Sequence, residues 1–171
     1  MKILITGFPG TGKSVIAVEL KRRGHQAYDP ENMRGYEYAV DRKTGERIHP
    51  PHPVPTGWYD TVAKQVWDPV KIYPLLVHPN DIFICSYVHE LTNYWHFFDL
   101  VFVLTLDDVI LEQRLSERHG PKLGKDGVEL RDIMKLHRDF ERSLVERGAI
   151  ALNAEHGVHE LVDTILNTVE A

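Results

Sequence analysis

The sequence predicts a doubly wound α/β fold, in which helices flank a five-stranded parallel sheet. Five short apolar runs, rich in β-branched residues and bounded by turn residues or charges, are typical of strands that are buried on both faces. Helical patterns separate most of these runs, and such alternation indicates a parallel sheet. The length of 171 residues suits a single domain of this kind.

The elements can be assigned in order along the chain. The predicted strands are Lys2–Thr6, Gln26–Asp29, Asp81–Ser86, Leu100–Leu106 and Ala149–Asn153. The predicted helices are Ser14–Arg23, Asp107–His119, Glu129–Arg147 and His156–Glu170. A glycine follows each of the first three helices, at Gly24, Gly120 and Gly148, and glycine commonly ends a helix.

Two segments interrupt this alternation. Residues 30–80 are rich in proline and include IHPPHPVPTGWYD, Ile48–Asp60, which we expect to form neither regular helix nor sheet. A long loop in a compact domain is usually functional, so we expect an inserted lobe here. Residues 119–129, HGPKLGKDGVE, have the glycine- and lysine-rich composition of a movable lid.

The amino-acid composition limits the partners and the cellular setting that can be expected for this protein. The formal net charge of -5 does not favour a nucleic-acid-coating protein. Cys85 is the only cysteine, which excludes an intrachain disulfide and a zinc site built from cysteines. The apolar run at the N-terminus is too short for a signal-peptide core or a membrane span. We therefore expect a reducing, cytoplasmic setting without membrane association.

The stretch GFPGTGKS, Gly7–Ser14, carries the most specific signal in the chain. It matches G-x-x-x-x-G-K-[ST], a loop whose backbone N–H groups surround a phosphate chain. The motif has meaning only between a strand and a helix, and both are predicted here. We expect Lys13 to bridge the β- and γ-phosphates of ATP and Ser14 to coordinate Mg²⁺. Gly7, Gly10 and Gly12 should let the backbone approach the phosphates.

Two arginines precede the predicted lid. Arg114 and Arg118 are four residues apart and share one helix face. They could form a solvated surface paired with nearby acids. Beside a phosphate loop they could instead stabilise a phosphoryl group in transfer. No guanine-reading motif of the N-K-x-D type is present, which weakens a GTPase interpretation.

With these motifs the chain resembles small P-loop kinases of the adenylate kinase and shikimate kinase type. The resemblance rests on GFPGTGKS, an acidic residue ending the second strand, R-L-x-x-R before a lid, and a last strand at residues 149–153. It implies that Arg114 contacts ATP, that Arg118 contacts phosphate, and that Arg138 or Arg142 completes this clamp. It further implies that the segment from Asn153 to Val158 passes beside the adenine.

The resemblance also extends the expected ATP site around the whole P-loop. Besides the glycines, Lys13 and Ser14, that site would include Pro9, Thr11 and Val15.

The binding site for the molecule that accepts the phosphoryl group is predicted around Asp29, where the second predicted strand ends. Shikimate-kinase-like enzymes have an Asp-x-Asp here, whereas this chain has Asp29-Pro30-Glu31. Asp29 is our candidate for orienting or deprotonating an acceptor hydroxyl, and a turn-capping role is the alternative. Either Asp29 or Asp107 would support Mg²⁺, although Asp107 equally suits a helix cap.

Further candidates for acceptor binding come from the lobe and the third strand. Arg34 could hold an acidic group or form a surface ion pair. Trp58 and Tyr59 offer aromatic faces for a base or a sugar. Ser86 could contact the substrate or simply end its strand. Trp67 is expected to pack in the lobe's own small core.

Together these features predict an ATP- and Mg²⁺-dependent kinase that phosphorylates a nucleoside, a nucleotide or another small polar metabolite. A nucleotide-binding switch with slow hydrolysis is the alternative from another class. A polynucleotide kinase would require a broad basic face to bind nucleic acid, and the negative net charge disfavours such a face. The acceptor's identity and the oligomeric state are left open.

Overall fold

A five-stranded parallel sheet forms the centre of the computed structural model, which describes residues 1–53, 55, 58–117 and 127–171. Its strand order is β2-β6-β1-β7-β8, and every neighbouring pair is parallel. The strands are β1 (Lys2–Gly7), β2 (Ala27–Tyr28), β6 (Ile82–Cys85), β7 (Leu100–Thr105) and β8 (Ile150–Asn153). The predicted fold class is confirmed, although β2 is shorter than predicted.

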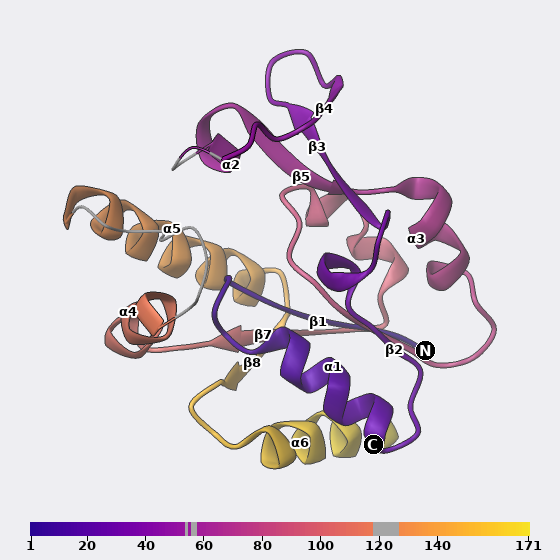
Figure 1. Ribbon diagram of the computed structural model, residues 1–171. Coiled ribbons are helices and arrows are strands. Elements are labelled where there is room, and N and C mark those ends of the chain that lie inside the picture. The colour runs from indigo at the N-terminus through magenta and orange to yellow at the C-terminus, as the bar shows by residue number, and fades with distance from the viewer. Residues whose placement is uncertain (54, 56–57, 118–126) are drawn as a thin grey trace.

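Helices cover both faces of this sheet (Figure 1). They are α1 (Lys13–Arg22), α3 (Pro69–Leu76), α4 (Asp108–Glu117), α5 (Gly127–Glu146) and α6 (Val158–Glu170). The short helix α2 (Trp58–Thr61) packs in the lobe instead, and three 3₁₀ turns are η1 (Pro30–Asn32), η2 (Leu91–Asn93) and η3 (Trp95–Phe97). Gly24 and Gly148 follow α1 and α5 with φ of 91° and 100°, as expected of glycines that end helices. Among the described segments, none of the helices is long and apolar enough to span a membrane.

The alternation of side chains along the strands creates two cores, one on each face. Ile3 and Ile5 of β1 pack with α1, α4 and α6, whereas Leu4 packs with α3 and with Leu144 of α5. Because both faces are buried, consecutive residues in the middle of the central strands are apolar, as in residues 3–5 of β1 and 82–85 of β6, which explains the uninterrupted runs in the sequence.

The segment predicted as an irregular lobe contains a second, antiparallel sheet. Its strands are β3 (Glu37–Asp41), β4 (Arg47–Ile48) and β5 (Ala63–Trp67), in the order β4-β3-β5. The expectation of irregular structure over residues 48–60 is therefore wrong at both ends, because Ile48 lies in β4 and α2 begins at Trp58. These residues pack with Ala39 and Ala63 in a small apolar cluster, which favours regular structure there.

Trp67 corrects a second expectation about the lobe. Its side chain is 1% exposed and belongs to the core of the large sheet, with Leu4 and Ile84, rather than to the cluster around Trp58. Asp68 then caps α3 by accepting a hydrogen bond from the Val70 N–H. Trp67 thus anchors the lobe to the main domain.

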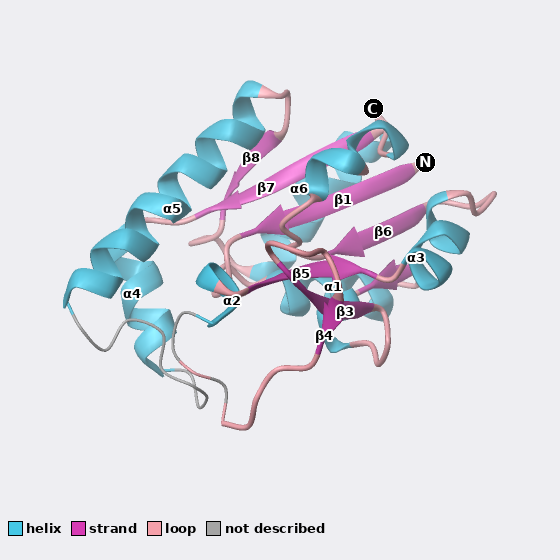
Figure 2. Cartoon of the chain, turned by 90° about the horizontal axis from the view of Figure 1, so that it is seen from above, coloured by secondary structure: helices cyan, strands magenta, loops and turns pink. Residues whose placement is uncertain are grey.

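The predicted lid lies mostly outside the described residues, between α4 and α5 (Figure 2). Residues 127–129, which the sequence placed in the lid, belong to the first turn of α5.

Candidate functional site

The P-loop, Gly7–Ser14, connects β1 to α1, and three positions of its backbone favour glycine. A Cβ on Gly7 would lie 2.6 Å from Thr11 Oγ1 and 2.9 Å from Leu104 Cβ. Gly10 and Gly12 both have φ of +103°, a region that side-chain-bearing residues rarely adopt. These three glycines therefore fix the path of the backbone from β1 into α1.

Lys13 lies at the floor of this loop and is 5% exposed. Its Nζ donates a hydrogen bond of 3.0 Å to the Gly7 carbonyl and lies 3.3 Å from Glu31 Oε1. The Tyr87 N–H donates to the same Glu31 oxygen at 2.9 Å. Glu31, whose role the sequence left open, thus joins the P-loop to the segment that follows β6.

A cavity of about 410 Å³ adjoins the P-loop. Its lining comprises Gly10, Thr11, Gly12, Lys13, Ser14, Val15, Ile16, Glu31, Arg114, Ala154, His156, Val158 and Leu161. The segment after β8, expected beside the adenine, therefore lies at this cavity. Pro9 and Asn153 are absent from the lining, and the Asn153 side chain instead accepts from the Glu155 N–H.

The arginines occupy different places. Arg114 on α4 lines the cavity and donates a hydrogen bond of 3.0 Å to the Ala154 carbonyl, which fixes the two walls together. Arg118 lies outside the described residues. Arg138 and Arg142 are exposed on α5 and face Asp108 and Asp139 respectively. Of the described arginines that were expected to clamp the phosphates of ATP, Arg114 lies at the cavity.

The residues beside Ser14 fit a magnesium ion. Asn32 of η1 donates through its side-chain amide to Ser14 Oγ at 3.1 Å and to Asp29 Oδ2 at 2.8 Å. Asp29 is 7% exposed, and its Oδ1 is a buried oxygen with no hydrogen-bond partner among the described residues. Hydroxyl and carboxylate oxygens are ligands that Mg²⁺ prefers. Asp107, the other candidate, caps α4 by accepting from the Val109 N–H.

A buried polar network joins the large sheet to the lobe. Ser86, fully buried after β6, donates to Glu37 Oε1 at 2.9 Å and accepts from Trp67 Nε1 at 3.1 Å. Burial raises the pKa of the Glu37 carboxyl to about 7, despite the hydrogen bonds from Ser86 and Gln65. The charge of Lys13 also acts on this carboxyl, so the network lies near the P-loop.

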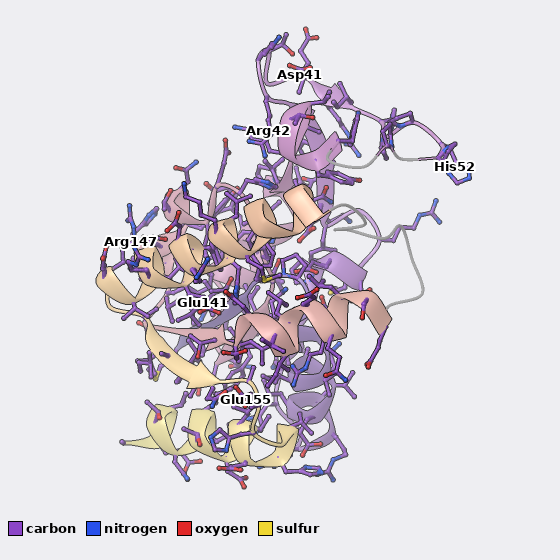
Figure 3. The ribbon with its side chains drawn as sticks, turned by 90° about the vertical axis from the view of Figure 1, so that its left-hand side faces the viewer. Asp41, Arg42, His52, Glu141, Arg147 and Glu155 are labelled. Carbon is purple, nitrogen blue, oxygen red and sulfur yellow. The ribbon has the colours of Figure 1, made fainter. Side chains whose placement is uncertain are left out.

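The remaining predicted acceptor residues are dispersed. Arg34 is exposed and lines neither this cavity nor a second one in the lobe. Trp58 is 8% exposed and packs inside the lobe's cluster, with its ring edge against Tyr59. Tyr59 does line the second cavity, which has a volume of about 220 Å³. Figure 3 shows the lobe tip at Asp41 and Arg42, far from Glu155 beside α6.

Sequence reasoning missed Glu37, Gln65 and Asn32. Asn32 lies three residues after Asp29 in one 3₁₀ turn, a local spacing that could have suggested the contact. Glu37 and Gln65 come together only through the pairing of β3 with β5, for which the sequence offered no signal.

A second buried group packs against the P-loop from α5. His137 is fully buried, its ring lies 5.4 Å from that of Phe8, and its nitrogens face Asp108 at 3.3 Å and Glu141 at 2.5 Å. Burial acts to lower the pKa of His137, but these carboxylates outweigh it and raise the pKa above its usual range. Glu141, visible on α5 in Figure 3, also accepts a hydrogen bond from the Leu106 N–H after β7, whereas the contact of His137 with Asp108 joins α5 to α4.

Comparisons with known proteins identify the family and the fold of the chain. A family model described as an AAA domain matches residues 3–135. A search of curated proteins gives no significant match. Among solved structures, the fold is similar to deoxyadenosine kinase from M. mycoides, with a TM-score of 0.56 and 19% identity over 99% of this chain and 98% of that one.

Shikimate kinase from Aquifex aeolicus is similar as well, with a TM-score of 0.54 and 16% identity over 99% of this chain and 96% of the other. A gluconokinase from Sinorhizobium meliloti aligns with a TM-score of 0.50 and 13% identity over 95% and 87% of the two chains. At these identities the likeness establishes the fold. The family match covers most of the sequence, including the P-loop, and so the chain belongs to the AAA-domain family of P-loop proteins.

Proposed function

We propose that this protein is an ATP- and Mg²⁺-dependent kinase that transfers a phosphoryl group to a small polar metabolite. The observation that carries the proposal is the pair of cavities, one lined by the P-loop and one in the lobe, with the Glu37 and Ser86 network linking the lobe to the P-loop side. The similar folds of deoxyadenosine kinase, shikimate kinase and gluconokinase support the same reaction class.

In this proposal, ATP occupies the cavity beside the P-loop. Lys13 and the backbone N–H groups bind the phosphates, and Arg114 fixes the wall formed by the segment after β8. Ser14 and Asp29 hold Mg²⁺, which would neutralise charge on the phosphate oxygens. Their separation is fixed by the Asn32 amide, which bonds to both. Arg118 stays a candidate for phosphate contact.

The most direct test is an ATP-consumption assay with Mg²⁺ over a panel of nucleosides, nucleotides, sugars and hydroxy acids. We expect one acceptor to stimulate ATP consumption. Lys13→Ala should lower the stimulated rate on the order of 10³-fold, because it removes the positive charge that stabilises the phosphoryl group during transfer. Lys71→Ala, which removes an exposed charge from α3, is the matched control and should leave the rate unchanged.

If every acceptor leaves the same slow hydrolysis while ATP still binds, the kinase proposal is wrong. A nucleotide-dependent change in partner binding would then be the property to measure.

A further inference from the structure

The lining of the second cavity indicates what kind of phosphoryl acceptor it could bind. It lies in the lobe, and its lining comprises Glu37, Tyr38, Ala39, Arg47, Ile48, His49, Pro50, Tyr59 and Gln65. Of these residues, only Tyr59 was expected from sequence to bind an acceptor. The cavity draws on all three strands of the antiparallel sheet and on α2.

Strand register sorts these residues onto two faces. Ala39 pairs with Gln65 on one side and with Ile48 on the other, and Glu37 lies two residues before Ala39, so these four side chains share one face. The short side chain of Ala39 stands in the middle of this face. Gln65 and Ile48 flank Ala39 on the two neighbouring strands, and Glu37 lies farther along β3. A ligand can therefore lie over Ala39, which is 5% exposed, with Glu37 at one end.

The basic residue of the lining belongs to the opposite face. Arg47 pairs with Val40, the neighbour of Ala39 along β3, and its guanidinium lies 4.5 Å from the centre of the Tyr38 ring. His49 is exposed at the rim. Arg34, the cation that sequence offered for an acidic acceptor, does not line the cavity. The face around Ala39 thus presents a carboxyl, an amide and apolar or aromatic groups.

The Glu37 end of this face is the end nearest the P-loop. Glu37 bonds to Ser86, whose backbone N–H donates to the carbonyl of Ile5 in β1, two residues before Gly7. Charges on Glu31 and Lys13 both act on the Glu37 carboxyl. An acceptor hydroxyl that is hydrogen-bonded to Glu37 would consequently lie at the end of the lobe cavity that is nearest the P-loop.

We propose that the acceptor is an uncharged metabolite with several O–H or N–H donors, seated over Ala39 and bound by Glu37 and Gln65. This inference rests on the proposed kinase function. A carboxylate and an amide oxygen accept hydrogen bonds from such donors. An acidic acceptor would instead bring a second negative charge beside Glu37 and Glu31, while Arg47, the guanidinium of the lining, lies over the Tyr38 ring on the other face of the sheet.

The test compares acceptors with and without an acidic group. One arm pairs a hexose with its hexuronic acid, which keeps the pyranose ring, and the other pairs ribonucleosides with their 3′-monophosphates, which keep the 5′-hydroxyl free. We expect Lys13-dependent ATP consumption with the uncharged member of one pair, at a kcat/KM roughly 100-fold above that of its charged counterpart. Which arm responds distinguishes a sugar from a nucleoside. This comparison uses the wild-type protein and so does not depend on the folding of a variant.

Two substitutions then locate the acceptor. Ala39→Leu fills the face and should raise the acceptor KM by about 10-fold or more while the ATP KM is unchanged. Glu37→Gln should also raise the acceptor KM, because an amide replaces the carboxylate that accepts from the substrate. Glu46→Gln, on the exposed turn between β3 and β4, is the matched control and should change neither constant.

The outcomes separate this inference from the kinase proposal. Lys13-dependent transfer that favours the charged members, or does not discriminate, overturns the uncharged acceptor and leaves the kinase intact. An unchanged acceptor KM in a folded Ala39→Leu protein overturns the location. Absence of Lys13-dependent transfer to every compound overturns both proposals.

Discussion

The two cavities are built in different ways. The P-loop cavity is formed largely by one continuous stretch, Gly10–Ile16, whose shape depends on backbone conformation. The lobe cavity is formed by side chains from three strands and a short helix, which meet through antiparallel pairing. Backbone N–H groups bind any phosphate chain, whereas side chains discriminate among ligands. We therefore expect the P-loop to tolerate little change and the lobe to determine which acceptor is used.

The largest effect should follow from placing a methyl group in the P-loop. Gly7→Ala would bring a Cβ to 2.6 Å from Thr11 Oγ1 and 3.1 Å from the Leu104 carbonyl oxygen, neither at the end of a long flexible side chain. We expect a loss of about 3 kcal/mol in the free energy of unfolding, at the upper end of overpacking costs, together with loss of ATP binding. Denaturant titration and nucleotide binding measure the two effects.

Gly157→Ala is the matched control, because Gly157 has φ of −63° and no atom lies within 4 Å of its added Cβ. Equal losses in the two variants would contradict the close packing proposed for Gly7.

The next effect concerns the lobe network and pH. The Glu37 carboxyl has its pKa raised from 4.5 to about 7, so the folded state binds its proton more tightly than the unfolded state does. Its stabilising contribution is full below about pH 4.5 and is lost as pH rises through 7. A shift of this size corresponds to about 3 kcal/mol, so above pH 8 Glu37→Gln should be more stable than the wild type by up to that amount.

Urea unfolding of both proteins at several pH values gives the required difference, and subtracting the two curves removes the contribution of other groups, including His137. A difference that does not grow between pH 5 and pH 8 would mean that the buried network around Ser86 does not hold this proton.

The smallest of these effects concerns the metal. Asn32→Ala removes the amide that holds Ser14 and Asp29 together. We expect the Mg²⁺ concentration for half-maximal ATP consumption to rise about 10-fold, as is typical when an outer partner of metal ligands is lost. Asn80→Ala, at an exposed position in the turn before β6, should leave the Mg²⁺ dependence unchanged. If both variants behave alike, Asn32 does not position the metal ligands.

The position of the P-loop between a strand and a helix could be predicted because this information is local in the sequence. Gly7, Lys13 and Ser14 are fixed by a strand, a tight turn and a helix that are adjacent in the chain, so spacing alone indicates their geometry. The five strands of the large sheet were also predicted, and in β1 and β6 burial on both faces leaves a clear apolar run.

The acceptor side could not be predicted in the same way. Glu37 and Gln65 are distant in sequence and meet because β3 pairs with β5 in one register. A shift of one residue would turn Gln65 to the other face. Trp67 was misplaced for a related reason, since its position in the core of the large sheet depends on where the lobe attaches.

The strand order has a consequence for the transfer itself. β1, which leads into the P-loop, and β6, which leads into Ser86, are direct neighbours in the sheet. Neighbouring strands lie about 4.8 Å apart, so the donor and acceptor sides diverge from points only one strand spacing from each other. The ladder between β1 and β6 therefore fixes the spacing of the two strand ends from which the P-loop and Ser86 begin.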